Sequence, residues 1–333
     1  MKRLFSTLIF CFSFLIQFIL FSSTKAVDMY SVIPLPEDFY HGNGHILNNH
    51  GQIAGRVSQE RVALAARDER KKKNPGASNY SESDFDPYEG AKAAYWDPKK
   101  GITIINVEAY KSSACSINDN GFVALSVYKD KQSIMVETPR TALWDIKTNA
   151  INIGPLGEAR NMGKTNVIWL ATPRYIGQSI LWNPQDNTLL RNPDIGTLKL
   201  HFLDIFNYSN SRGTKLFQNN SDLSLFYSGK EYLLVVKEGN LSNVAHAAHL
   251  NDNDEVIAMT IVKNGAKDQN VITRWNKGKD ATTSDYLQSY PELNDYAFFR
   301  IVGFNNKGQI LLTATKDSSF YYHNLFLMTP MPL

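Results

Sequence analysis

The feature of this sequence that most restricts its fold is a repeated turn signal, Asn-x-x-Gly followed at once by an apolar segment. Copies begin at Asn48, Asn118, Gly163, Asn210, Asn251 and Asn305, and the copy at Gly163 is degenerate. From residue 118 onward, these starting points lie 45, 47, 41 and 54 residues apart. Such a period is typical of the four-stranded blades of a β-propeller.

A second signal, an aromatic residue followed by a turn, alternates with the first. It occurs at Trp96, Trp144, Trp182 and Trp275, each followed by Asp or Asn, and a fifth copy begins at Tyr227. Asn, Asp and Gly accept a positive φ, so both signals predict tight turns between strands. The aromatic ring supplies an apolar body for packing between sheets. Segments 114–117, 122–127, 141–144 and 150–153 show the resulting four-strand unit.

The repeat therefore predicts an all-β fold, a β-propeller of about six four-stranded blades. The last unit ends at its third strand, residues 324–330, and lacks a fourth. An unassigned strand, residues 30–35, begins the part of the chain after the first apolar run. We expect this N-terminal strand to close the last blade, because that pairing would remove an open sheet edge.

The first 26 residues have the character of a secretory signal peptide. Lys2 and Arg3 precede an apolar run over residues 4–21, and small or polar residues lead to a predicted cut after Ala26. The alternative is a retained anchor, because the run approaches the roughly 20 residues that a membrane span needs. We expect export, with residues 27–333 as one secreted or periplasmic domain that keeps no stable membrane span.

Charge and cysteine content narrow the function classes. The chain has 35 Lys and Arg against 32 Asp and Glu, and the signal segment contains three bases (Lys2, Arg3, Lys25) and no acid. The mature protein would be close to neutral, which argues against a nucleic-acid partner. It would keep one cysteine, Cys115, so no internal disulfide framework is expected. Cys115 lies in an alternating apolar segment, which favours a buried inert thiol over a nucleophile.

Three segments resemble the exported HAF-repeat proteins, a bacterial family of extracellular repeat proteins. Residues 47–55 (LNNHGQIAG) are similar to the first half of that repeat. Residues 141–144 (TALW) with 150–154 (AINIG) are similar to the second half, and 324–330 to the family's usual ending. The His-Ala-Phe triplet that names the family is missing here. The resemblance implies a secreted, propeller-like protein and no catalytic residues.

The first unit carries an insertion, residues 58–91, that the other units lack. It holds a short helix-forming segment, a basic run and an acidic-aromatic segment, and the long loop 129–140 is predicted to share its face. The candidate ligand-binding residues are Arg61, Arg67, Arg70, Tyr80, Asp84, Asp86, Tyr88, Lys129 and Arg140. The alternative is a solvated loop without a ligand.

No sequence feature requires a metal, a cofactor or a reaction. His246 and His249 are three apart, so on a strand they point to opposite faces and cannot share one metal ion. The oxygen-rich segment 251–255 resembles a Ca²⁺ loop in composition, but its place in the repeat favours a turn. Motifs of serine hydrolases, zinc proteases and dithiol sites are absent. Asp84, Asp86, Asp119 and Asp204 are acids that could pair as in glycosidases.

These observations predict a binding or interaction module whose partner is a protein or a glycan. Two alternatives remain open. One is a hydrolase or lyase that acts on polysaccharides, with carboxylates or a histidine at the mouth of the propeller. The other is a structural envelope protein.

Overall fold

The computed structural model describes residues 29–58, 90–129, 139–171, 180–191, 208–210, 212–219, 222–234, 244–264, 267–316 and 323–332. Within these residues the chain forms six four-stranded antiparallel sheets, and the one helical segment is a 3-10 turn, Leu287–Ser289 (η5). No helix in this part of the chain is long and apolar enough to cross a membrane. The predicted signal peptide and almost all of the predicted insertion lie outside the described residues.

Five sheets follow the order of the chain. Sheet 1 contains β2 (Phe39–His41), β3 (Ile53–Val57), β4 (Lys92–Asp97) and β5 (Gly101–Ile104). Sheet 2 contains β6 (Lys111–Ile117), β7 (Phe122–Tyr128), β8 (Arg140–Asp145) and β9 (Ile151–Leu156). Sheet 3 contains β10 (Glu158–Met162), β11 (Ile168–Ala171), β12 (Ile180–Asn183) and β13 (Thr188–Arg191). Sheet 4 contains β14 (Tyr208–Ser209), β15 (Lys215–Asn219), β16 (Asp222–Tyr227) and β17 (Lys230–Leu233). Sheet 5 contains β18 (Val244–Leu250), β19 (Glu255–Asn264), β20 (Lys267–Asn276) and β21 (Lys279–Thr283).

Sheet 6 joins the two ends of the described chain. It contains β22 (Phe298–Phe304), β23 (Ile310–Thr315), β24 (Asn324–Pro330) and, at its edge, β1 (Tyr30–Pro34). β1 pairs antiparallel with β24 along its whole length, from Tyr30 opposite Pro330 to Pro34 opposite Phe326. The N-terminal strand therefore supplies the missing fourth strand of the last unit, as the repeat predicts.

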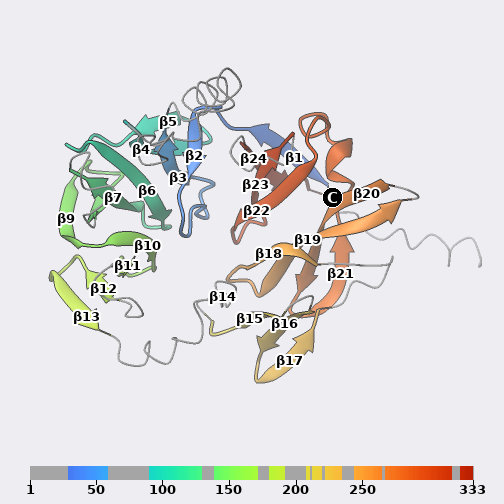
Figure 1. The fold of residues 1–333 in the computed structure, drawn as a ribbon. Helices are drawn as coiled ribbons and strands as arrows, with labels where there is room; N and C mark the ends of the chain where they lie inside the picture. Colours follow the sequence, from blue (N-terminus) through green and yellow to red (C-terminus); the bar gives the residue numbers. More distant parts are fainter. Residues whose placement is uncertain are drawn as a thin grey trace, which may run out of the picture.

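The six sheets surround a common centre in a propeller-like arrangement (Figure 1). The first strand of each sheet lies on the inside, and first strands of neighbouring units contact one another, as β6 does with β10 and β18 with β22. The arrangement follows from the repeat because each unit can bury an apolar sheet face only against its neighbours. The all-β prediction is confirmed.

Five apolar clusters fill the spaces between adjacent sheets. They lie between sheets 6 and 1, 1 and 2, 2 and 3, 4 and 5, and 5 and 6. The four repeated tryptophans are all buried, and Trp182 and Trp275 are among the largest fully buried side chains. The packing role predicted for the second signal is confirmed. Within the described residues, no such cluster joins sheets 3 and 4.

The residue after three of the four repeated tryptophans, Trp96, Trp144 and Trp182, starts a turn through its own side chain. Asp97 Oδ1 accepts the backbone N–H of Lys99 at 2.8 Å, and Asp145 Oδ1 accepts that of Lys147 at 2.8 Å. These are the side-chain-to-backbone bonds two residues on that the sequence predicts. They hold down the pKa of Asp145, because backbone N–H groups stabilise its charged form.

Cys115 is a buried free thiol, in agreement with the sequence interpretation. Its Sγ lies 3.3 Å from Ser126 Oγ, in the cluster between sheets 2 and 3. Burial raises the pKa of the Cys115 thiol to about 11. A thiol with that pKa is almost fully protonated at neutral pH and is a poor nucleophile.

Candidate binding site at the turn face

The six Asn-x-x-Gly turns meet on one side of the ring of sheets, here called the turn face. In each turn the positive φ falls at the fourth position, as at Gly51 (78°), Gly121 (84°) and Gly308 (75°). The leading asparagines do not adopt a positive φ. The predicted tight turns are confirmed, and the side chains of the leading asparagines have a further role.

The leading asparagines join each turn to the next. Their Nδ2 groups donate to the carbonyl oxygen of the first residue of the following turn, over distances from 2.9 to 3.3 Å. The bonds run from Asn48 to Asn118, Asn118 to Gly163, Asn210 to Asn251, Asn251 to Asn305 and Asn305 to Asn48. We call these five asparagines the asparagine girdle. Its last bond joins residues 257 apart in the sequence and ties sheet 6 to sheet 1.

Each girdle asparagine also builds its own turn. Asn305 Oδ1 accepts the backbone N–H groups of Lys307 at 3.0 Å and Gln309 at 2.9 Å. Its Nδ2 donates a second bond to Gln309 Oε1 at 2.8 Å. Asn305 is 3% exposed, so its amide is a buried polar group with its bonding capacity used. The third turn begins with Gly163, which has no amide to donate, and this is where the girdle is interrupted.

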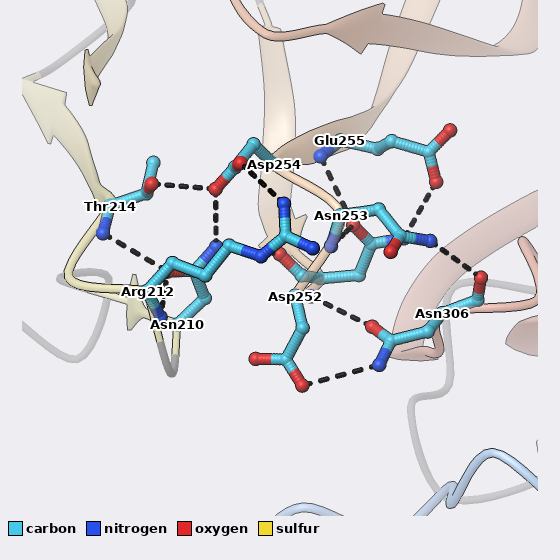
Figure 2. Close-up of polar contacts among 9 residues, drawn as sticks. Asn210, Arg212, Thr214, Asp252, Asn253, Asp254, Glu255 and Asn306 are labelled. Carbon is cyan, nitrogen blue, oxygen red and sulfur yellow. Dashed lines mark hydrogen bonds and ion pairs between the residues drawn. The ribbon is translucent and has the colours of Figure 1, made fainter. Parts of the chain in front are cut away.

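The second residues of the turns form a polar group at the centre of the turn face. This central cluster consists of Asn49, Asp119, Lys164, Asp252 and Asn306. Asn49 donates its backbone N–H to Asp119 Oδ1 at 2.7 Å and its Nδ2 to Asp119 Oδ2 at 2.6 Å. Asn306 links Asn49 to Asp252, since its N–H donates to Asn49 Oδ1 and its Nδ2 to Asp252 Oδ2. Figure 2 shows the Asp252–Asn306 pair.

One ion pair crosses the cluster between sheets that are not neighbours. Lys164 Nζ of the third turn lies 2.7 Å from Asp252 Oδ2 of the fifth turn. The Lys164 side chain is 60% exposed and that of Asp252 is 22% exposed. The cluster thus presents opposite charges to solvent at one point, on turns that the sheets hold in place.

Two histidines lie next to the central cluster. His45 is solvent-exposed, although protein surrounds it closely enough that desolvation lowers its pKa. Asp119 and Asp252 oppose this shift and Lys164 adds to it, which places His45 within the field of all three charges. His249 Nε2 lies 3.1 Å from the carbonyl oxygen of Ile301. His41, His45 and His50 are close in the sequence but have different partners, since His41 contacts the His323 ring and His50 bonds the Asp119 carbonyl.

His249 gives a prediction for the pH dependence of stability. Burial lowers the pKa of His249 to about 4, whereas an unfolded histidine titrates near 6.5. As the pH falls, the unfolded chain takes up this proton first, so the contribution is complete above about pH 6.5 and is lost toward pH 4. Between pH 7.5 and 5 the loss is at most about 2 kcal/mol. His249→Gln keeps a donor for Ile301 but cannot titrate, so its stability should fall less over this range.

Urea unfolding of both proteins at pH 7.5, 6 and 5 checks this. The carboxylates titrate in both chains, so their effect cancels in the comparison. Two curves of equal slope against pH would show that His249 is not protonated on unfolding.

A pocket of about 370 Å³ opens beside the central cluster, between sheets 4 and 5. We call it the side pocket. Its lining comes from three turns and consists of Arg212, Gly213, Thr214, Phe226, Tyr227, Ser228, Gly229 and Asp254. Asp254 is 1% exposed and accepts bonds from Asn210 Nδ2 at 2.7 Å and Thr214 Oγ1 at 2.6 Å. Its other oxygen lies 3.3 Å from Arg212 Nη1, as Figure 2 shows.

The candidate residues named from the sequence are only partly described. Seven of them, from Arg61 to Tyr88 in the insertion, lie outside the described residues. Lys129 and Arg140 are exposed at the ends of β7 and β8 that point away from the turn face, and Arg140 Nη1 donates to the Gly154 carbonyl at 3.2 Å. The predicted patch around the insertion stays a prediction.

The sequence analysis missed the central cluster and the side pocket. The sequence does contain a signal for the central cluster. The second position of five aligned turns is always polar and is charged in three of them. The sequence alone identifies Asp119 only as one acid among several, and segment 251–255 only as a turn. The structure confirms that turn. In the part of the chain that the structure describes, no three acidic, His or Cys side chains gather as metal ligands.

Comparisons with known proteins give distant likenesses only. No protein-family model matches the chain, and no curated protein matches it. An acylaminoacyl peptidase from Pyrococcus horikoshii is 10% identical with a TM-score of 0.38, over 92% of this chain and 46% of that one. The chain thus spans about half of the peptidase. A putative gluconolactonase is 9% identical, with a TM-score of 0.37 over 90% and 92% of the two chains. A chain of a mitotic checkpoint complex is 7% identical, with a TM-score of 0.41 over 93% and 95%. Likenesses at this level do not bear on function.

Proposed function

We propose that the protein is an exported β-propeller binding module that holds a glycan fragment at the central cluster of the turn face. The observation that carries this proposal is the convergence of Asp119, Lys164 and Asp252 from three different units on one solvent-accessible point. Carboxylate, ammonium and amide groups together supply the donors and acceptors that sugar hydroxyls need. Export and kinship with the HAF-repeat proteins are part of the same proposal.

The Lys164–Asp252 ion pair contributes little to holding the turns together. The asparagine girdle joins all adjacent turns except the third and fourth with neutral hydrogen bonds. An ion pair as exposed as Lys164–Asp252 contributes about 0–1 kcal/mol to stability. Polar loop residues held by a rigid scaffold are where binding sites concentrate. A ligand is therefore the better explanation for these charges.

The test is a thermal-shift screen of the purified protein against neutral glycan fragments. A ligand that binds only the folded state stabilises it, by about 2.7 kcal/mol at a hundredfold excess over Kd. We expect a glycan to raise the Tm of the protein and of Asp295→Asn, an exposed acid away from the turn face, but not of Asp252→Asn. A flat response across the panel, or a shift that Asp252→Asn retains, would reject the central site. A flat response would also favour a protein partner or a structural role.

A polysaccharide hydrolase is the second candidate, because His45 lies in the field of both Asp119 and Asp252. Acid catalysis needs a protonated carboxyl group. Both aspartates instead accept hydrogen bonds from protein donors, which fits fixed acceptors in a binding site better than a proton donor. Release of new reducing ends from a glycan that binds, lost in Asp119→Asn, would support the enzyme.

A further inference from the structure

We infer that the side pocket is a second, separate site that binds the carboxylate of an acidic sugar residue, a uronate, through Arg212. This goes beyond the proposed function, because the central cluster supplies none of the pocket's lining. The argument rests on the charge, shape and apolar wall of the pocket.

Arg212 is the one cation among the residues that line the pocket. Its side chain is 57% exposed and is anchored at one nitrogen by Asp254 Oδ2. A guanidinium carries five N–H donors, so one anchoring bond leaves a pair available for a carboxylate in bidentate geometry. The anchoring bond also fixes the guanidinium, which lowers the entropy lost on binding.

Asp254 is a support for Arg212 and not a competing ligand. Its Oδ1 accepts bonds from Asn210 and Thr214, and its Oδ2 interacts with Arg212. It occupies the fourth turn position with a φ of 64°, where four of the other five turns have glycine. Asp accepts that conformation more readily than most other L-residues. The carboxylate of Asp254 is buried next to the Arg212 guanidinium.

The opposite wall suits a sugar ring. Phe226 is 40% exposed and Tyr227 packs partly into the cluster between sheets 4 and 5. Aromatic faces of this kind offer apolar area for the C–H face of a pyranose, while the Ser228–Gly229 backbone lies at the rim. A volume of 370 Å³ is at the small end of ligand pockets, which fits one sugar unit. A single arginine balanced by one aspartate fits a monoanion better than a phosphate dianion.

The experiment compares D-glucuronate with D-glucuronamide, its neutral isostere, by saturation-transfer NMR and calorimetric titration at neutral pH. We expect the acid to bind about tenfold more tightly, which corresponds to 1.4 kcal/mol. Arg212→Gln should remove the difference between the two ligands. Arg212→Lys keeps the charge but cannot form two parallel hydrogen bonds to a carboxylate. It should therefore retain only part of the difference in affinity between the acid and the amide. Phe226→Ala should weaken both ligands alike.

The matched control is Lys307→Gln, which removes a cation from the same third position of the sixth turn and should change nothing. Acetate binding as tightly as glucuronate would overturn the inference, as would equal binding of acid and amide to the unmodified protein. Asp252→Asn should bind glucuronate normally. Failure of the central site and failure of the side pocket therefore give different results.

Discussion

Removing residues 27–36 is expected to leave a protein that unfolds or aggregates under conditions where the parent is folded. The deletion removes β1, whose Tyr30 and Val32 are buried against β24 together with Leu35 beyond the strand. Each buried side chain of this size contributes about 1.5–3 kcal/mol. The sum is comparable to the whole stability of an average domain, about 5–15 kcal/mol. The deletion would also leave β24 as an unpaired edge, which promotes association between molecules.

The alternation along β1 provides matched controls. Val32 faces the core and is 8% exposed, whereas its neighbour Ile33 faces solvent and is 40% exposed. Val32→Ser should lower the Tm by several degrees, and Ile33→Ser should leave it nearly unchanged. The measurements are thermal unfolding by circular dichroism and light scattering. A deletion variant as heat-stable and monomeric as the parent would show that β1 is not needed to close the last sheet.

The closing strand could be predicted because it follows from local patterns and a count. Turn residues and alternating apolar positions predict both ends of β7 within one residue and the C-terminal end of β6, although β6 begins three residues earlier than predicted. The last unit was short by one strand and the chain began with a strand that had no partner. The pairing of Tyr30 with Pro330 connects residues 300 positions apart. It could still be predicted, because one unit lacked a strand and one strand lacked a partner.

The role of the girdle asparagines could not be predicted in the same way. A turn signal describes what four consecutive residues do, and Gly51 and Gly121 meet that need. The bonds from Asn48 to Asn118, or from Asn305 to Asn48, depend on how far apart neighbouring units sit around the ring. The same holds for Lys164 and Asp252, which become neighbours only once the third and fifth units face each other.

The insertion at 58–91 departs from the repeat and is therefore easy to identify in the sequence, whereas the central cluster lies within the repeat. Asn49, Asp119 and Asn306 occupy equivalent positions and read as ordinary turn residues one at a time. Only a comparison of the second residues of all the turns identifies them as a group. A ring brings equivalent positions together at its centre, so variation in charge among equivalent positions is the more informative signal in a protein of this kind.

Replacing Asn305 with alanine is expected to lower the free energy of unfolding by about 3 kcal/mol. The change removes four hydrogen bonds at once and leaves the Asn48 carbonyl and two backbone N–H groups without their partner in a buried site. A buried group left unsatisfied costs about 1–3 kcal/mol, and neighbouring losses are not fully additive. Asn305→Asp keeps the two accepted bonds but loses both donated ones, and it places a charge against two oxygens. It should be at least as damaging.

The control is Asn253→Ala, an exposed asparagine on the same face that donates one bond to the Asn306 carbonyl at 2.8 Å. We expect it to cost less than about 1 kcal/mol. Urea unfolding measures all three variants, with an unchanged m-value as the sign that the folded and unfolded states are otherwise alike. If Asn305→Ala cost no more than Asn253→Ala, the ring would be held by its apolar clusters alone. A loss near 3 kcal/mol would instead show that the repeated asparagine couples units at opposite ends of the chain.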